Sequence, residues 1–332
     1  MKKIRVAING FGRIGRLVLR AALESGRKDI EFVAINDISP IEQNVYLLQY
    51  DSVHGKFPMD VKQSGDFIVI GKNKIKCLCE RNASNLPWKK LNIDIVMECT
   101  GLFTSADKAR VHIDCGAKRV LISAPSVGAD KTVVFGVNEK TLTKKDLIVS
   151  NASCTTNCLA PVLNILNKKF GVKNGWMTTV HSYTGDQQLL DKNHKDFRRA
   201  RAANLSMVPT STGAAKTIGV ILPKLAGKMD GISVRVPTPD VSLIELVLNM
   251  NKKVSVESVN KVFMASQSDI LETAEKPLVS IDFVHNSHSA IVDTSLTKVV
   301  DNNVLHISAW YDNEWGFSNR MCDTAVAMGK LL

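Results

Sequence analysis

A glycine-rich turn between a short strand and a helix is the feature that most limits how this chain can fold. Residues 4–8 read Ile-Arg-Val-Ala-Ile, a β-rich run, and a helical pattern of apolar residues starts at Leu17. The turn between them, at 10–15, follows the pattern GxGxxG in the strand-to-helix context that this motif needs. Its glycines permit a tight turn, close approach to a diphosphate and close packing of helix on strand. We therefore expect a parallel α/β sheet whose first helix directs its N-terminus at a dinucleotide.

An acidic residue follows the second expected strand. Residues 31–35 form another β-rich run, and Asp37 lies 22 residues after Gly15. This is near the spacing at which a carboxylate accepts a hydrogen bond from a ribose 2′-hydroxyl. A carboxylate there repels a 2′-phosphate, so the pattern favours NAD over NADP. An ordinary glycine turn and turn aspartate are the alternative, but strand, turn, helix, strand and acid occur in the order that the motif demands.

The rest of the first half continues an α/β pattern. Short apolar runs that lead into Thr100-Gly101 and Ser123-Ala124 are typical of parallel strands with ligand-facing loops at their carboxyl ends. The segment 106–116 predicts a crossover helix. The expected strands are 67–70, 74–79, 93–98, 119–122 and 147–150. We predict a Rossmann-type, doubly wound dinucleotide-binding domain over 1–152, completed by a C-terminal helix at 317–332.

A cysteine at a helix start is the strongest chemical signal in the chain. Cys154 follows small polar residues and precedes an apolar-periodic run, with Ser153 as the expected N-cap and Gly171 as the expected stop. Unpaired N–H groups and the helix dipole favour a thiolate there, and the thiolate is the nucleophile. The alternative is an inert buried cysteine, which we expect for Cys158 one helical turn later.

The second half predicts an α+β domain over 153–316. Its expected strands alternate apolar and polar residues, which favours a mostly antiparallel sheet with one covered face. His181 ends the first of these strands and is a natural acid and base for a thiol, although a single histidine is more often structural. The expected strands are 175–180, 230–237, 241–251 and 303–311, with helices at 212–222 and 256–268.

Hydroxyls and arginines follow His181 in unusual density. These are the groups that bind phosphate in proteins, so the segment indicates a phosphorylated substrate beside the cysteine. The arginines could instead pair with Asp191 and Asp196 at the surface. The anion-binding candidates are Thr184, Arg198, Arg199, Arg201, Thr212, Gly213 and Arg235.

Composition limits the remaining classes. With 332 residues, of which 45% are hydrophobic, the chain can bury two cores, and it contains no apolar run of the length of a membrane span. Seven scattered cysteines without zinc-site spacing indicate no metal site and a reducing cytoplasmic compartment. The start of the chain lacks the pattern of a signal peptide. The net charge of +11 suits anionic partners, but it is dispersed, so we expect no dedicated nucleic-acid site.

These residues together resemble the phosphorylating glyceraldehyde-3-phosphate dehydrogenases, over essentially the whole chain. The matching stretches are long and specific. They are Ile8 to Arg16, Tyr50 to Gly55, Ala152 to Ala160, His181 to Gln187, Thr210 to Lys216, Arg235 to Pro239 and Trp310 to Arg320.

The resemblance implies roles for individual residues. Cys154 would be the nucleophile, which forms a thiohemiacetal and then a thioester, and His181 would be its partner. Inorganic phosphate would lie against Ser153, Thr155, Thr212 and Gly213, and the substrate's own phosphate against Thr184, Arg199 and Arg235. NAD would contact Gly10, Gly12, Arg13, Ile14, Gly15, Asp37, Arg81, Thr100, Ser123 and Asn313.

The resemblance also implies a homotetramer in which the segment 182–207 reaches toward a neighbouring subunit's cofactor. Two departures stand out: Lys192-Asn193 replaces the Leu-Pro of many NAD-strict members, and Phe317 replaces a tyrosine. Lys192 would attract a 2′-phosphate, so we expect some use of NADP. The nearest rival is an erythrose-4-phosphate dehydrogenase, and semialdehyde dehydrogenases are more distant. A polyanion-binding or adhesion protein is the non-enzymatic alternative.

Overall fold

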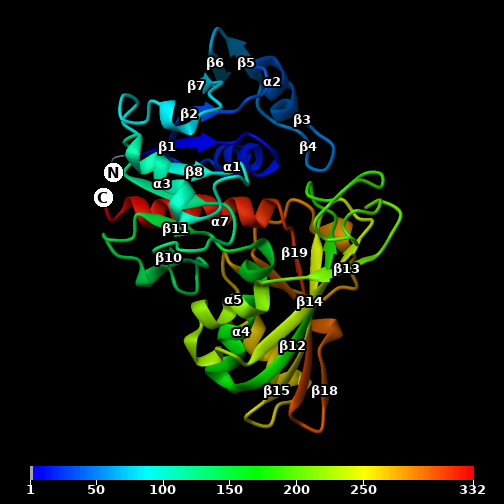
Figure 1. Cartoon of the computed structure of the whole chain (residues 1–332). Helices are drawn as coiled ribbons and strands as arrows, with labels where there is room; N and C mark the ends of the chain where they lie inside the picture. Colours follow the sequence, from blue (N-terminus) through cyan, green and yellow to red (C-terminus); the bar gives the residue numbers. More distant parts are fainter. Residues whose placement is uncertain (1–2) are drawn as a thin grey trace. The chain divides into compact units, whose positions relative to one another are not determined.

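In the computed structural model, which describes residues 3–332, the chain divides into two compact units, each built on its own sheet (Figure 1). The first unit comprises Met1–Ser153 and Ser318–Leu332, and the second comprises Cys154–Phe317. Residues 1–2, the start of the predicted first domain, lie outside the described residues.

The first unit contains a nine-stranded sheet in the order β10-β11-β9-β8-β1-β2-β7-β6-β5. All pairs from β10 to β7 are parallel, whereas β7, β6 and β5 pair antiparallel, so the predicted strands 67–70 and 74–79 form a hairpin. The strands are β1 (Ile4–Asn9), β2 (Ile30–Asn36), β5 (Val61–Ser64), β6 (Phe67–Ile70), β7 (Asn73–Leu78), β8 (Ile95–Glu98), β9 (Arg119–Ile122), β10 (Lys131–Thr132) and β11 (Ile148–Ser150), with a separate pair β3 (Tyr50–Asp51) and β4 (Gly55–Lys56).

Four helices accompany this sheet. The predicted helix at 106–116 is confirmed as α3, and most of the C-terminal helix α7 belongs to this unit. The helices are α1 (Arg13–Glu24), α2 (Ile41–Gln49), α3 (Ala106–Asp114) and α7 (Trp315–Gly329).

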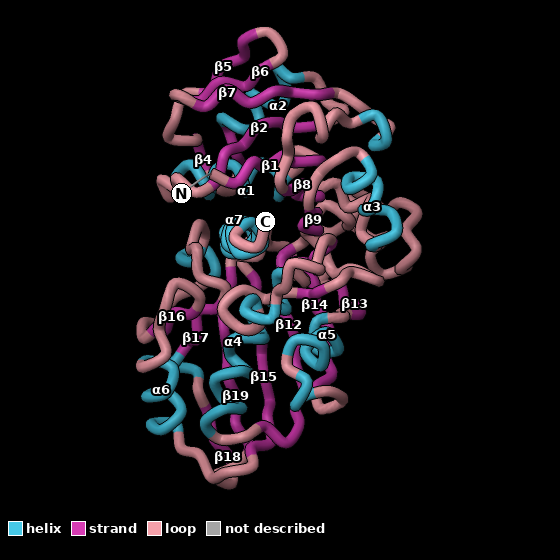
Figure 2. Tube along the Cα trace, turned by 90° about the vertical axis from the view of Figure 1, so that its left-hand side faces the viewer, coloured by secondary structure: helices cyan, strands magenta, loops and turns pink. Residues whose placement is uncertain are grey.

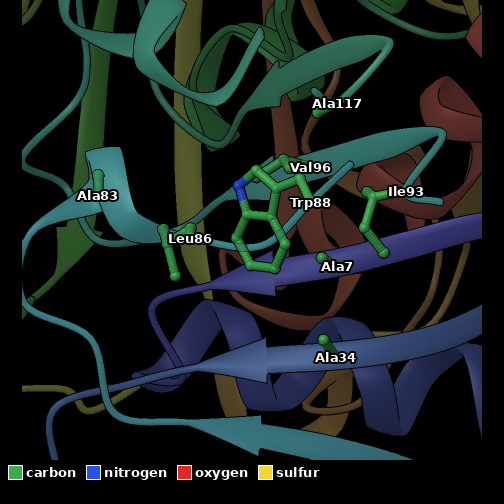
Figure 3. Packing of buried hydrophobic residues seen from close by; sticks show 8 residues of the cluster. All are labelled: Ala7, Ala34, Ala83, Leu86, Trp88, Ile93, Val96 and Ala117. Atoms are coloured by element: carbon green, nitrogen blue, oxygen red, sulfur yellow. The ribbon is translucent and has the colours of Figure 1, made fainter. Parts of the chain in front are cut away.

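A buried tryptophan organises one face of the sheet. Trp88 is fully buried and packs with Leu86, Ile93 and Val96, with the small residues Ala7 and Ala34 on neighbouring strands (Figure 3). Alanines on β1 and β2 leave room for the large indole, so the loop before β8 packs closely on the sheet.

The second unit contains an eight-stranded mixed sheet, in the order β13-β14-β12-β15-β19-β17-β16 with β18 paired to β19 (Figure 2). Most pairs are antiparallel, as predicted, but β12 with β14 and β16 with β17 are parallel. The strands are β12 (Val172–Ser182), β13 (Val208–Ser211), β14 (Met229–Val236), β15 (Ser242–Met250), β16 (Leu271–Ala274), β17 (Ala290–Asp293), β18 (Lys298–Val300) and β19 (Val304–Tyr311).

Helices cover one face of this sheet. Helix α4 (Cys154–Lys169) contacts β12, β15, β17 and β19, helix α5 (Ala214–Ile221) contacts β14, and α6 (Val256–Met264) contacts β16. The predicted helix start at Cys154 is confirmed, and Gly171, with a φ of 73°, follows the helix end as predicted. Helices α5 and α6 are shorter than predicted because Gly213 caps the first and a turn ends the second.

Short 3₁₀ segments complete the chain, and they are Ala83–Asn85, Glu139–Thr141, Pro223–Leu225, Ser280–Phe283 and Thr294–Leu296. Among the described residues, no helix is both long and apolar enough to cross a membrane.

Candidate functional site

The glycine-rich turn of the first unit packs closely against the backbone that follows β8. Gly10 has a φ of 90°, and a Cβ on it would lie 2.6 Å from the backbone nitrogen of Thr100. A Cβ on Gly15 would lie 2.2 Å from the carbonyl oxygen of Gly10. Only glycine fits at both positions, which explains why the motif carries them.

The start of α1 offers an anion site. Gly12 is its N-cap, no side chain caps the helix, and no acidic residue occupies the first turn, where Arg13 and Ile14 lie. A Cβ built on Gly12 meets no atom within 4 Å, so the helix terminus is open on that side. A helix N-terminus with space in front of it fits the diphosphate of a dinucleotide.

Asp37 is fixed to the same turn. Its carboxylate accepts hydrogen bonds from the backbone N–H of Phe11 at 2.7 Å and of Ser39 at 2.8 Å. The Asp37 side chain therefore lies beside the glycine-rich turn, as a partner for a ribose hydroxyl would.

The other predicted cofactor residues of this unit lie just beyond neighbouring strand ends. Arg81 follows β7, Thr100 follows β8 and Ser123 follows β9, where its N–H donates to the carbonyl oxygen of Glu98 at 3.0 Å. The Thr100 hydroxyl is used internally, since it donates to the Glu98 carboxylate and accepts from the N–H of Leu102. Asn313, the remaining predicted contact, belongs to the second unit.

In the second unit, the predicted nucleophile and base are in contact. The Sγ atom of Cys154, at the start of α4, lies 3.4 Å from Nε2 of His181, at the end of β12. His181 is 3% exposed. Packing of α4 on β12 thus brings together two residues that are 27 positions apart.

The tautomer of His181 follows from its other ring nitrogen. Nδ1 lies 2.8 Å from the carbonyl oxygen of Ser182, which can only accept, and 3.1 Å from Nη1 of Arg235, which can only donate. The two hydrogens of Nη1 have the Ser182 carbonyl and the Thr184 hydroxyl as acceptors, so the shorter contact assigns a proton to Nδ1. The lone pair of Nε2 then faces Cys154 and can accept the thiol proton. The Arg235 guanidinium donates to the same carbonyl oxygen at 3.1 Å.

The ionisation of this pair differs from the sequence prediction. Burial raises the pKa of the Cys154 thiol, although Arg235 and the N–H groups at the start of α4 act to lower it. Burial, together with the charge of Arg235, lowers the pKa of His181 to about 3. Desolvation therefore acts on the thiol pKa against the thiolate that the sequence predicts, whereas Arg235 and the helix terminus act for it.

A predicted anion-binding residue, Arg235, lies beside His181. Parallel pairing of β12 and β14 places Arg235 opposite His181 in register, and the Arg235 guanidinium donates to the Thr184 hydroxyl at 3.0 Å. Among the described residues, Nε of Arg235 is buried without a hydrogen-bond partner. A half-buried guanidinium with an unpaired Nε, beside a hydroxyl, fits an anionic ligand.

Arg199 is connected to Thr184 through the carboxylate of Asp186. It pairs with Asp186 at 2.7 Å, and the Thr184 hydroxyl donates to the same carboxylate. The alternative predicted for the arginines holds for Arg201, which pairs with Asp191 at 2.7 Å, and in part for Arg199, whose Nε lies 3.6 Å from the Asp196 carboxylate.

The remaining predicted anion ligands lie at two helix starts. Gly213 is the N-cap of α5 without a side-chain cap, and the Thr212 hydroxyl accepts from the N–H of Ala214 at 3.2 Å. Thr155 lies in the first turn of α4, directly after Cys154, and Ser153 directly precedes it.

Sequence reasoning missed Tyr311. Its hydroxyl is hydrogen-bonded to the hydroxyls of Thr155 at 2.8 Å and Thr179 at 2.9 Å, and its ring meets the His181 ring edge-on. Tyr311 thereby supports both the first turn of α4 and the histidine. Its place at the end of an alternating strand was the available signal.

Comparisons with known proteins agree with this geometry. Residues 4–106 match the family model "Glyceraldehyde 3-phosphate dehydrogenase, NAD binding domain", and residues 153–313 match "Glyceraldehyde 3-phosphate dehydrogenase, C-terminal domain".

Curated relatives match over almost their whole length. The chain is 58% identical to the glyceraldehyde-3-phosphate dehydrogenase of Xanthobacter flavus and 56% identical to that of Cereibacter sphaeroides, in each case over 99% of both chains. It is 52% identical to the enzyme of the same name from Zymomonas mobilis, again over 99% of both. The chain therefore belongs to the glyceraldehyde-3-phosphate dehydrogenase family.

Proposed function

We propose that this chain oxidises D-glyceraldehyde 3-phosphate to 1,3-bisphosphoglycerate in glycolysis and gluconeogenesis, with NAD and inorganic phosphate as co-substrates. The observation that carries the proposal is the contact of Cys154 Sγ with the unprotonated Nε2 of His181, beside the half-buried guanidinium of Arg235. A nucleophile, its base and an anion site within one unit are the parts that acyl transfer to phosphate needs.

Cys154 begins the reaction as a nucleophile. As Sγ attacks the aldehyde carbon, its proton moves to Nε2 of His181, and a carbon–sulfur bond forms. The backbone N–H of Cys154 and the protonated His181 stabilise the oxyanion, which takes up the proton to give a thiohemiacetal.

His181 then acts as a base. Nε2 removes the hydroxyl proton of the thiohemiacetal, and the carbon loses its hydride to leave a thioester on Cys154. NAD supplies the hydride acceptor when it is bound. Nδ1 keeps its proton throughout and donates it in a hydrogen bond to the Ser182 carbonyl, so only Nε2 exchanges protons.

Inorganic phosphate completes the reaction. A phosphate oxygen attacks the thioester carbon, the carbon–sulfur bond breaks, and the acyl phosphate leaves while the Cys154 thiolate regains the proton held on Nε2 of His181. Ser153, Thr155, Thr212 and Gly213 would hold the attacking phosphate, since two of them lie at the open start of α5. Thr184 and Arg235 would hold the substrate's own phosphate, with Arg199 acting through Asp186.

The first unit would hold NAD. The open start of α1 suits the diphosphate, and Asp37 suits the adenosine ribose. Arg81, Thr100 and Ser123 lie on the adjoining loops, and Asn313 of the second unit would contact the nicotinamide. Asp37 makes NAD the preferred cofactor, and Lys192 would allow some use of NADP.

We further propose a cytoplasmic homotetramer. Two apolar surfaces of the second unit support this assembly. Trp176 and Val247 are paired on the outer face of the sheet and are 47% and 46% exposed. The segment 182–207 exposes Leu189, Leu190, Phe197 and Leu205. Apolar surface of this extent is typical of subunit contacts.

One assay tests the activity. NAD reduction with glyceraldehyde 3-phosphate should depend on inorganic phosphate and should exceed NADP reduction. Erythrose 4-phosphate in the same assay should react much more slowly, and a reversed order would assign the chain to the alternative dehydrogenase. Binding to a polyanion without any turnover of either aldehyde would favour the non-enzymatic alternative.

A further inference from the structure

A row of side-chain hydrogen bonds crosses the carboxyl ends of four adjacent parallel strands in the first unit. In sheet order these strands are β8, β1, β2 and β7. Glu98 ends β8, Asn9 ends β1, Asn36 ends β2, and the backbone of Glu80 follows β7. We call these four residues the strand-end row.

Each member of the strand-end row bonds to the next. Glu98 Oε2 accepts from Asn9 Nδ2 at 2.7 Å, and Asn9 Oδ1 accepts from Asn36 Nδ2 at 2.8 Å. The amide of Asn36 also bonds twice to the Glu80 backbone, accepting from N at 2.9 Å and donating to O at 3.0 Å. Glu98, Asn9 and Asn36 are between 1% and 5% exposed, so water does not compete for these bonds.

The direction of every bond in the row is fixed from its Asn36 end. A backbone N–H only donates and a carbonyl only accepts, so Glu80 sets the orientation of the Asn36 amide. Asn36 then presents Nδ2 to Asn9, which must present its oxygen. The Nδ2 of Asn9 is left to donate to Glu98.

The other neighbours of Glu98 are also donors. The indole N–H of Trp88 donates to Nδ1 of His112 at 3.1 Å, so His112 carries its proton on Nε2 and donates to Glu98 at 3.0 Å. The second carboxylate oxygen accepts from the backbone N–H of Thr100 at 2.7 Å and from the Thr100 hydroxyl. Position 98 therefore requires a group that only accepts.

The strand-end row lies directly beneath the loops assigned to NAD. The N–H of Gly10 donates to the carbonyl of Asn36 at 2.8 Å, and Asp37 is the next residue along the chain. The N–H of Cys99 donates to the carbonyl of Asn9 at 2.7 Å, beside Thr100. A shift of one strand end would move the glycine-rich turn relative to Asp37.

We propose that Glu98 is a positioning residue for the dinucleotide, which acts through Asn9, Asn36 and Thr100 to hold the three NAD-binding loops in register. The proposal rests on the assignment of these loops to NAD. Glu98 itself is 1% exposed and holds the loops before the cofactor arrives. Loops fixed in the bound conformation spare the ligand the cost of ordering them, so the row should contribute to affinity.

The test is a set of matched variants in an NAD-binding titration of the full chain. Glu98→Gln keeps the shape but places an amide N–H₂ against the donors of Asn9 and His112. We expect NAD to bind about tenfold more weakly, which corresponds to 1.4 kcal/mol. Alkylation of Cys154 without NAD should stay within about twofold of the wild-type rate, because the second unit is unchanged.

Asp94→Asn is the control. Asp94 is a similarly buried carboxylate just before the opposite end of β8, where it accepts from the N–H of Arg5 and pairs with Lys118. It should cost stability while NAD affinity stays within about twofold of wild type. Equal weakening by Asp94→Asn and Glu98→Gln, or unchanged binding in Glu98→Gln, would overturn the proposal.

Two further variants separate the possible failures. Asn36→Asp replaces the donating amide at the other end of the row by an acceptor, and it serves if Glu98→Gln does not fold. It should also weaken NAD binding. Unchanged NAD affinity in Asn36→Asp overturns the proposal. Asp37→Ala reports on the loop assignment itself, since it should weaken NAD and improve the use of NADP. No change in Asp37→Ala would refute the assignment of the loops, whereas a change there without one in Glu98→Gln would refute only the positioning role.

Discussion

Two buried histidines, one in each unit, hold their protons on opposite ring nitrogens. His112 is 0% exposed and His181 is 3% exposed. The Trp88 N–H faces Nδ1 of His112, so that ring is protonated on Nε2. The Ser182 carbonyl lies closest to Nδ1 of His181, and the nearby Arg235 donates to that carbonyl and to Thr184, so the His181 ring is protonated on Nδ1.

The difference shows that the donors and acceptors around a buried histidine decide what its ring nitrogens can do. His112 has both nitrogens engaged, with Trp88 and with Glu98, and has no lone pair for chemistry. His181 keeps the lone pair of Nε2 directed at Cys154. Burial is the same in both cases and does not distinguish the structural from the catalytic role.

The largest effect should come from removing the group that His181 serves. Cys154→Ser replaces the thiol by a hydroxyl, which is a far weaker nucleophile and a poorer leaving group for transfer to phosphate. We expect a loss in kcat of about 10,000-fold or more, with NAD binding retained. Steady-state kinetics and an NAD titration measure the two properties. Unchanged activity would show that Cys154 resembles Cys158 rather than a nucleophile.

Replacing His181, the histidine whose Nε2 lone pair is available, should have the next largest effect. His181→Asn removes the acceptor of the thiol proton, and we expect kcat/KM to fall by about 100-fold to 10,000-fold. Alkylation of Cys154 by iodoacetamide near neutral pH should slow as well. If its pH profile is the same in both proteins, the start of α4 alone activates the thiol, and the contrast between the two histidines loses its chemical meaning.

The opposite outcome is expected around His112. Trp88→Phe leaves Nδ1 without its donor, and we expect the free energy of unfolding to fall by about 1–3 kcal/mol. The value of kcat/KM should stay within about twofold, because no reacting atom is involved. Urea unfolding and steady-state kinetics measure these effects. Ile93→Val in the same apolar cluster is the control for lost packing. A loss of activity on the scale of His181→Asn would break the comparison.

Features that depend on local sequence could be predicted. The helix start at Cys154 follows from hydroxyl residues before an apolar-periodic run, and both signals lie within a few residues. The glycine-rich turn and Asp37 follow from one strand–helix–strand unit. His181 at the end of its strand is of the same kind.

Features that depend on tertiary packing could not be predicted from the sequence. Trp88, His112 and Glu98 meet only because α3 packs on the sheet, and no spacing along the chain signals that contact. The parallel pairing of β12 with β14, which brings Arg235 to His181, needs a crossover through residues 183–228. The desolvation that raises the pKa of the Cys154 thiol could not be predicted either, since it depends on the whole fold.

The smallest effect concerns a buried acid whose charge is again decided by its neighbours. Burial and the nearby charges of Asp312 and Glu314 raise the pKa of Asp240 well above its ordinary value. In the unfolded chain this carboxyl ionises near about pH 4, so between pH 5 and 8 the folded chain binds more protons and loses stability as the pH rises. Asp240→Asn has no such proton and should therefore flatten this dependence. Urea midpoints at pH 5 and pH 8 measure it, with exposed Asp230→Asn as the control. An unchanged slope would mean that Asp240 ionises freely in the fold, and that its neighbours, unlike those of His112 and His181, do not set its protonation.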